Sequence, residues 1–143
     1  MRVFFGGPLT DLKNPEKVKP FYKKMAGVAE ANGWEYYWAF LRGTDPEDNP
    51  DVPSSRVYQI DTYELEKSDV MVAYVGEPST GTGIEIEYAR THNIPVYLMF
   101  EESKRISRML RGSPIVRGEI IFTAEEDALE KLGLLLNKLD RPS

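Results

Sequence analysis

The 143-residue sequence contains no cysteine and only one histidine, His92. The absence of cysteine excludes disulfides, thiolate metal ligands and cysteine nucleophiles, and a single histidine argues against a histidine-rich metal site or a serine–histidine relay. Any catalysis must therefore depend on carboxylates, hydroxyls or lysine. We expect neither a metal nor a cofactor.

The sequence also lacks an excess of positive charge and a long apolar run. Its 18 Lys and Arg residues against 23 Asp and Glu give a formal net charge of −5, which disfavours nucleic acid as a partner and favours a small molecule. No run of 18 apolar residues occurs, and no basic stretch precedes an apolar segment at the start of the chain. These absences predict no membrane association and a cytoplasmic location.

What the chain does contain is typical of a globular domain. Its composition is 41% hydrophobic and 29% charged, and its length is that of one domain with one core, which we place at residues 1–143.

Short apolar runs alternate with segments of helical spacing along the chain. The runs predict strands over 2–7, 35–40, 69–75, 95–100 and 119–123. The helical spacing predicts helices from Asn14 to Gly33 and over 58–67, 82–93, 103–112 and 124–139, with a long irregular loop over 41–55. This alternation predicts an α/β fold, a single doubly wound, flavodoxin- or Rossmann-like sheet of five parallel strands in the order 2-1-3-4-5.

Two glycine-rich segments follow the first and third predicted strands: GGPLTD (6–11) and GEPSTGTG (76–83). The expected strand order places them side by side at the carboxyl edge of the sheet, where such folds bind ligands. A glycine loop leading into a helix can hold a phosphate or a ribose hydroxyl, although neither a P-loop nor a dinucleotide fingerprint is present. A strand-to-helix turn without a ligand remains the alternative.

Two acidic residues, Glu85 and Asp61, lie near the starts of predicted helices. Two carboxylates across one crevice permit glycoside chemistry, in which one attacks the anomeric carbon and the other handles the proton. Glu85 can equally be a capping-box residue bonded back to Thr82, three residues before it. Acidic residues near helix starts are also common for electrostatic reasons, so spacing alone leaves both interpretations open.

Four segments together resemble one known family: RVFFGGP (2–8), DTYELEKSDVMVAYV (61–75), PSTGTGIE (78–85) and SRMLRG (107–112). They are similar to the nucleoside 2-deoxyribosyltransferase superfamily, and within it to the 2′-deoxynucleoside 5′-phosphate N-hydrolases. The resemblance covers residues 2 to about 112. It implies cleavage or exchange of the base–sugar bond of a nucleoside or nucleotide, with Glu85 as nucleophile on C1′ and Asp61 assisting proton transfer at the base.

The resemblance also implies a substrate-binding set. Ser79 matches a serine that binds the 5′-phosphate in the nucleotide hydrolases, and nucleoside transferases carry an acidic residue there, which would repel a phosphate. Ser107 matches a serine that reaches the phosphate from a neighbouring subunit, so the resemblance implies a homodimer with shared sites. The full set comprises Phe4, Gly7, Pro8, Ser79, Gly81, Gly83, Ser107 and Arg108.

The sequence departs from the family at three places. Phe4 replaces a tyrosine whose hydroxyl lies against the nucleophilic glutamate, and Pro8 and Thr10 replace a serine and an arginine that hold the phosphate, a role for which Lys13 or Arg108 could compensate. Glu87 replaces a glycine. Besides a nucleotide N-glycosidase, the alternatives are a nucleoside transferase, a nucleotide-binding or sensing module without catalysis, and an unrelated flavodoxin-like domain.

Overall fold

The computed structural model describes residues 1–140. Its elements are β1 (Arg2–Gly6), α1 (Pro15–Ala31), β2 (Glu35–Trp38), the 3₁₀ turn η1 (Ala39–Leu41), α2 (Ser54–Glu66), β3 (Val70–Tyr74), α3 (Thr80–Thr91), β4 (Val96–Glu101), α4 (Arg108–Arg111), β5 (Val116–Phe122) and α5 (Glu125–Leu139). None of the helices within these residues has both the length and the apolar character needed to cross a membrane.

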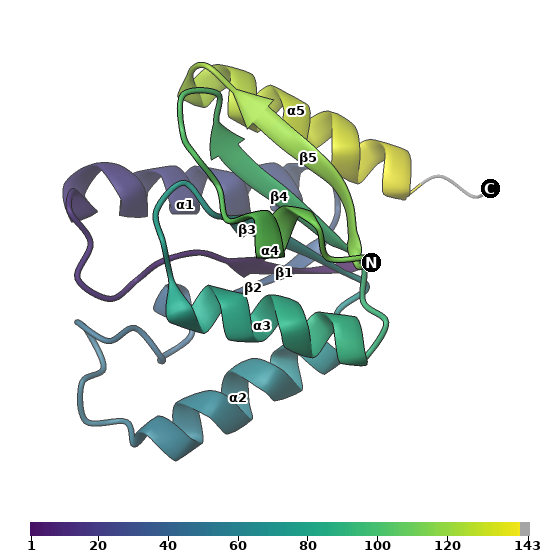
Figure 1. The fold of residues 1–143 in the computed structure, drawn as a ribbon. Helices are drawn as coiled ribbons and strands as arrows, with labels where there is room; N and C mark the ends of the chain where they lie inside the picture. Colours follow the sequence, from purple (N-terminus) through teal and green to yellow (C-terminus); the bar gives the residue numbers. More distant parts are fainter. Residues whose placement is uncertain (141–143) are drawn as a thin grey trace.

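The five strands form one parallel sheet in the order β2-β1-β3-β4-β5, which confirms the predicted fold class and strand order. Helices cover both faces of the sheet: α1 and α5 lie on one side, and α2, α3 and α4 lie on the other (Figure 1). Strands buried on both faces need apolar residues at successive positions, and every residue of β3 is buried.

Alternation along β1 supplies both cores. Phe5 points to the α1 side, where its ring stacks on Trp38 at 5.6 Å and Trp38 stacks on Tyr22 at 4.1 Å. Phe4 points to the α2 and α3 side and packs in a core that includes Leu65. Since successive side chains of a strand face opposite ways, β1 fixes both helical layers relative to its own carboxyl end.

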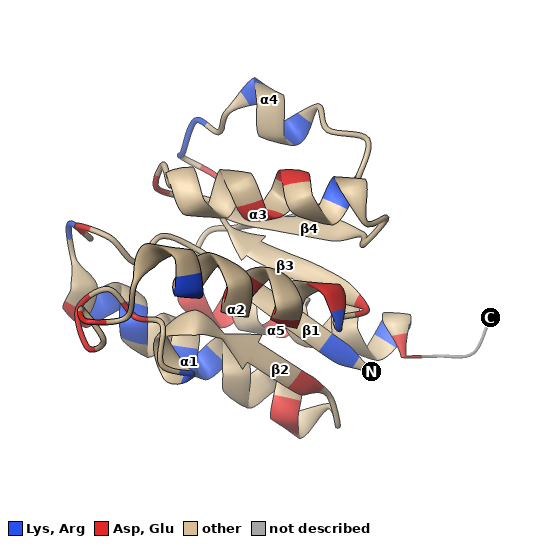
Figure 2. Ribbon diagram, turned by 90° about the horizontal axis from the view of Figure 1, so that it is seen from below, with Lys and Arg blue, Asp and Glu red and all other residues tan. Residues whose placement is uncertain are grey.

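Some element boundaries differ from the sequence-based expectation. The predicted helix over 103–112 is wrong in extent, because only Arg108–Arg111 is helical. Figure 2 shows this short basic helix beside α3. The chain turns directly after β4, where the Lys104 amide donates to the Glu101 carbonyl at 3.0 Å. A helix over 103–112 would carry four cations and no acidic residue, so few favourable charge pairs would support it, and short isolated helices have little stability of their own.

The loop between η1 and α2 is shorter than predicted, since α2 already begins at Ser54, and it is tied to α1 by an ion pair. Lys19 Nζ lies 2.7 Å from Asp45 Oδ2 and 3.2 Å from Glu47 Oε2. Asp45 is 0% exposed, and its other oxygen accepts a hydrogen bond from the Glu47 amide at 2.9 Å. A buried charge persists only when it is paired, so this contact fixes the loop against the domain.

Candidate active site

A cavity of about 660 Å³ lies over the carboxyl ends of β1, β2 and β3. Both glycine-rich loops border it, as the strand order predicts: the one after β1 and the one that leads into α3. The loop between η1 and α2 forms a further wall. The polar side chains that line the cavity are Thr10, Thr44, Asn49, Ser54, Asp61, Ser79, Thr80, Thr82 and Glu85.

The two predicted carboxylates, Glu85 and Asp61, both line this cavity. Neither lies in the first turn of its helix. Helix α3 begins at Thr80, and its N-cap is Ser79, whose Oγ accepts a hydrogen bond from the Thr82 amide at 3.2 Å. Glu85 therefore lies in the second turn of α3, and the capping-box alternative for it is wrong. Asp61 lies in the middle of α2, so its predicted place at a helix start is also wrong.

Glu85 lies against the end of β1. A Cβ atom added to Gly6 would come within 3.4 Å of Glu85 Oε1 and 2.7 Å of Met71 Cε, so any larger residue there would push on both side chains. Within residues 1–140, the Glu85 carboxylate accepts no hydrogen bond. Burial first, and then the charge of Asp61, raises the pKa of Glu85 well above its usual range.

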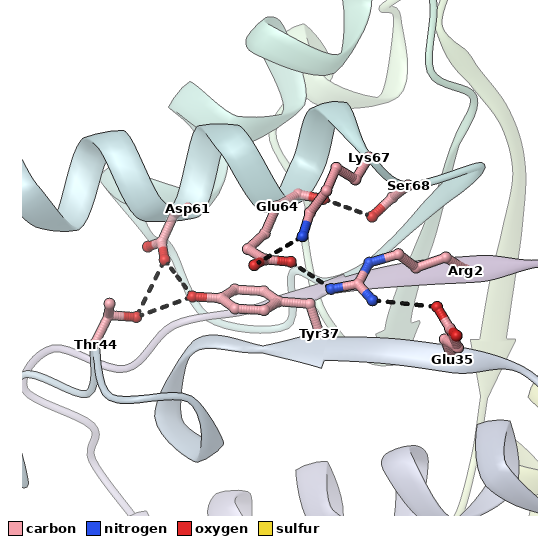
Figure 3. A network of polar contacts seen from close by, with 8 residues as sticks. All are labelled: Arg2, Glu35, Tyr37, Thr44, Asp61, Glu64, Lys67 and Ser68. Atoms are coloured by element: carbon pink, nitrogen blue, oxygen red, sulfur yellow. Dashed lines mark hydrogen bonds and ion pairs between the residues drawn. The ribbon is translucent and has the colours of Figure 1, made fainter.

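Asp61 is held by two hydroxyl groups, as Figure 3 shows. Tyr37 Oη donates to Asp61 Oδ1 at 2.7 Å, and Thr44 Oγ1 donates to the same oxygen at 3.1 Å. Burial raises the pKa of Asp61; the hydrogen bonds from Tyr37 and Thr44 oppose that rise, and the charge of Glu64 adds to it. Our sequence analysis missed both hydroxyl residues.

Helix α2 is also tied to the sheet one turn beyond Asp61. Arg2, at the start of β1, bonds to Glu64 of α2, and its other guanidinium nitrogen lies 3.4 Å from Glu35 Oε2 (Figure 3). Lys67 Nζ lies 3.3 Å from the second oxygen of Glu64. These contacts set the position of α2 along β1 and β2, and so place Asp61 at the cavity.

Four residues of the predicted substrate-binding set line the same cavity as the two carboxylates: Gly7, Pro8, Ser79 and Gly81. Gly83 and Arg108 do not line it. Phe4 does not reach the cavity either, because it is completely buried below it, with its ring stacked on Tyr37 at 5.3 Å.

Ser107 is separated from the large cavity within its own chain. It borders a smaller cavity of about 90 Å³ together with Arg105, and Ser79 and Thr82 line both cavities. Thr82 is 3% exposed, and its hydroxyl oxygen has no hydrogen-bond partner within residues 1–140. The start of α3 thus separates the two cavities and presents an unpaired buried hydroxyl between them.

The sequence is similar to curated proteins that share one name. No protein-family model matches the chain. A protein of Syntrophotalea carbinolica is 28% identical over 116 residues, covering 80% of each chain. A protein of Thermofilum pendens is 25% identical over 139 residues, covering 95% of each. Both carry the name "Putative 2′-deoxynucleoside 5′-phosphate N-hydrolase 1".

Solved structures with a similar fold include a CMP N-glycosidase and a 2-deoxyribosyltransferase. The CMP N-glycosidase of Clostridium botulinum superposes with a TM-score of 0.73 and 25% identity, covering 94% of this chain and 99% of that one. A 2-deoxyribosyltransferase of Bacillus psychrosaccharolyticus shares the fold, with a TM-score of 0.67 at 17% identity over 92% of this chain and 96% of that one. Sequence and fold together confirm that the chain resembles the nucleoside 2-deoxyribosyltransferase superfamily and, among its members, proteins named as 2′-deoxynucleoside 5′-phosphate N-hydrolases.

Proposed function

We propose that this protein is an N-glycosidase that cleaves the base–sugar bond of a nucleoside or deoxynucleoside 5′-monophosphate through a covalent glycosyl–Glu85 intermediate. The observation that carries the proposal is that Glu85 and Asp61 line one cavity at the start of α3. The names of the sequence relatives and of the CMP N-glycosidase supply the substrate class.

The reaction proceeds in two displacements. In the free protein, burial favours the pair's proton on Glu85, and the reacting form has this proton on Asp61 and an ionised Glu85. Glu85 then attacks C1′ as the bond from C1′ to the base nitrogen breaks, and Asp61 gives its proton to the departing base. Water then attacks C1′, passes a proton to the Asp61 carboxylate, and releases Glu85 as a carboxylate. The sugar phosphate leaves with its original anomeric configuration, because two inversions restore it.

The carboxyl pair is suited to hold the one proton that the base needs. Burial raises the pKa of both Glu85 and Asp61, and the negative charge of Asp61 adds to the rise at Glu85. Two interacting carboxyl groups titrate as a pair, so the second proton is retained to a higher pH than on an isolated carboxyl group. The pair can then be singly protonated at neutral pH, with one group to attack and one to protonate.

The start of α3 is the proposed phosphate position. The described residues that line the large cavity include no lysine or arginine, so an anion there depends on the N-terminal amides of this 12-residue helix, on Ser79 and on the unpaired Thr82 hydroxyl. Arg105 lines the adjoining small cavity together with Ser79 and Thr82, which supports it as the cation that pairs with the phosphate.

A substrate panel tests the function directly. The protein is incubated with ribo- and deoxyribonucleoside 5′-monophosphates and their nucleosides, and free base is followed by chromatography. We expect base release from at least one monophosphate and none with Glu85→Gln. Formation of a new nucleotide or nucleoside after addition of a second base would identify a transferase, and the absence of any base release would contradict the proposal.

Phe4→Tyr is expected to raise kcat about three- to tenfold. Phe4 and Gly6 face the same side of β1, and Glu85 Oε1 lies beside Gly6, so a hydroxyl on the Phe4 ring would approach the unbonded Glu85 carboxylate from below. Single-turnover rates measure the effect, and melting temperatures control for the buried hydroxyl. No turnover in either protein, together with micromolar nucleotide binding, would identify a binding module instead.

We also propose that the protein is a homodimer with shared sites. Large apolar side chains are exposed on the helical layer that holds both carboxylates: Tyr58 (54%) and Tyr63 (58%) on α2, Ile84 (50%) on α3 and Met109 (87%) on α4. A second subunit on this face would cover them and bring its Ser107 towards the partner's site. Light scattering is expected to give a dimer or larger.

Mixed dimers test whether the sites are shared. Glu85→Ala and Ser107→Ala chains, each defective alone, are mixed and allowed to exchange subunits. One site of each mixed dimer then has both residues intact, so up to about half of the natural activity per dimer is expected. No recovery after confirmed exchange would show that Ser107 acts within its own chain, beside Ser79.

A further inference from the structure

The hydroxyl group of Tyr37 contacts one of the two proposed reacting carboxylates and is not part of the family pattern described above. We propose that Tyr37 is a positioning residue: together with Thr44 it fixes Asp61 Oδ1, so that Asp61 Oδ2 is the oxygen that carries the proton to the departing base. This inference rests on the proposed function.

Strand register brings Tyr37 to this place. Phe4 of β1 and Tyr37 of β2 are paired across the parallel ladder, and their rings stack at 5.3 Å with an interplanar angle of 21°. Both rings belong to the core on the α2 and α3 side. The strand next to β1 therefore supplies an aromatic hydroxyl beside the position where Phe4 lacks one, and that hydroxyl bonds to Asp61 instead of Glu85.

The two oxygens of Asp61 are not equivalent. Oδ1 accepts from both Tyr37 and Thr44, whereas Oδ2 has no hydrogen bond within residues 1–140 (Figure 3). An oxygen that already accepts two hydroxyl protons is a poor place for a third proton, so the acidic proton of Asp61 belongs on Oδ2. Burial raises the pKa of Tyr37, which keeps its hydroxyl protonated and available as a donor.

The pKa of Asp61 depends both on its charged neighbours and on the hydroxyl groups of Tyr37 and Thr44. Glu85 faces it from α3 and Glu64 lies one turn along α2, where it is paired with Arg2 and Lys67. The charge of Glu64 favours a protonated Asp61, as does burial. The hydrogen bonds from Tyr37 and Thr44 stabilise its ionised form and act in the opposite direction, so losing one raises the pKa of Asp61.

A purely structural role for Tyr37 would be to hold α2 on β2. The contacts of Arg2 with Glu64 and Glu35 already tie α2 to both strands, and Tyr37→Phe keeps the ring that stacks on Phe4. The variant therefore removes the hydroxyl and leaves the packing in place. Tyr36→Phe is the matched control, because Tyr36 packs against Phe5 on the opposite face of the sheet.

Two substrates separate positioning of the acid from structural damage. For an ordinary nucleoside monophosphate we expect Tyr37→Phe to lower kcat about tenfold at nearly unchanged KM, and to move the alkaline limb of the pH profile to higher pH. A 7-methylguanine nucleotide carries its positive charge before the bond breaks, so its base leaves without a proton and its kcat should change by less than about twofold. Tyr36→Phe should leave both substrates unaffected.

A titration independent of turnover completes the test. In protein labelled with ¹³C at the aspartate carboxyl carbons, NMR should show a higher pKa for Asp61 in Tyr37→Phe than in the natural protein, and no change in Tyr36→Phe. If the natural protein cleaves no nucleotide, the proposed function fails, and this titration still decides whether Tyr37 controls Asp61. An unchanged Asp61 titration, or equal losses of kcat on both substrates, would overturn the inference.

Discussion

Glu85→Gln is expected to lose at least about a thousandfold in kcat and still bind nucleotide. Glutamine has nearly the same shape as glutamate, but it cannot become the anionic nucleophile that attacks C1′. The proposed substrate contacts at the start of α3 and in the loop between η1 and α2 do not involve the Glu85 carboxylate. Chromatography of released base measures the loss, and calorimetry with the natural substrate measures the binding. Turnover near the natural rate would end the glycosidase proposal.

The same substitution is expected to stabilise the folded protein at neutral pH. Burial and Asp61 raise the pKa of Glu85, so the folded protein keeps a proton that the unfolded chain releases above the usual carboxyl pKa. Because the folded state then binds more protons, its stability falls as pH rises above about 4.5, the ordinary value for glutamate. The gain in melting temperature from Glu85→Gln should therefore be smallest near that pH and should grow towards neutrality.

Glu87→Gln is the matched control, since Glu87 lies on the same helix outside the cavity. Its hydrogen bond with Arg90 lowers the pKa of Glu87, so the ionised Glu87 adds to the stability of the folded protein above the usual carboxyl pKa. Glu87→Gln should therefore bring no gain in melting temperature at neutral pH. Melting curves of the three proteins across pH make the comparison. An equal, pH-independent change in both variants would contradict the raised pKa of Glu85.

Ser79→Asp is expected to remove any preference for a nucleotide over its nucleoside. Ser79 is the N-cap of α3, and aspartate is as good a cap as serine, so the helix start should survive the change. The added charge would face the substrate phosphate. Repulsion of about 1–3 kcal/mol predicts that kcat/KM for the monophosphate falls by about 5- to 150-fold, with little change for the nucleoside.

Ser79→Ala separates charge from loss of the hydroxyl. It removes the cap and one phosphate contact but adds no charge, so its effect on the monophosphate should be smaller than that of aspartate. The measurement is kcat/KM for each nucleotide and nucleoside pair in all three proteins. If the natural protein handles both substrates equally well, or if alanine and aspartate act alike, the phosphate does not lie at Ser79.

Much of this fold follows from local patterns in the sequence. Apolar runs as in β3, bounded by helical segments, predict strands buried on both faces, and short crossovers leave few strand orders. The start of α3 was placed too late because Ser79, and not Thr82 three residues further on, is its N-cap; the Ser79 hydroxyl accepts a hydrogen bond from the Thr82 amide. Helix α4 was overestimated because helical spacing does not reveal that the chain turns after β4.

The candidate site was only partly predictable for a related reason. Glu85 and Asp61 belong to contiguous motifs, so resemblance identified them before the structure placed them in one cavity. Tyr37 and Thr44 meet Asp61 only through the pairing of β2 with β1 and the path of the following loop. No local pattern carries that information, and Tyr37 in particular is one of several aromatic residues in a strand where aromatic residues are ordinary.

The ion pair of Lys19 with Asp45 affects how substrate specificity can change during the evolution of this protein. It fixes the loop at one buried point, whereas Pro46, Asn49, Pro50 and Val52 face the cavity beyond that point. Point substitutions at these positions can change which base is accepted without moving either carboxylate. Lys19 and Asp45 form a coupled pair, since losing one leaves the other charge unmatched. Among related proteins we therefore expect Lys19 and Asp45 to be conserved together and the cavity-facing residues of this loop to vary.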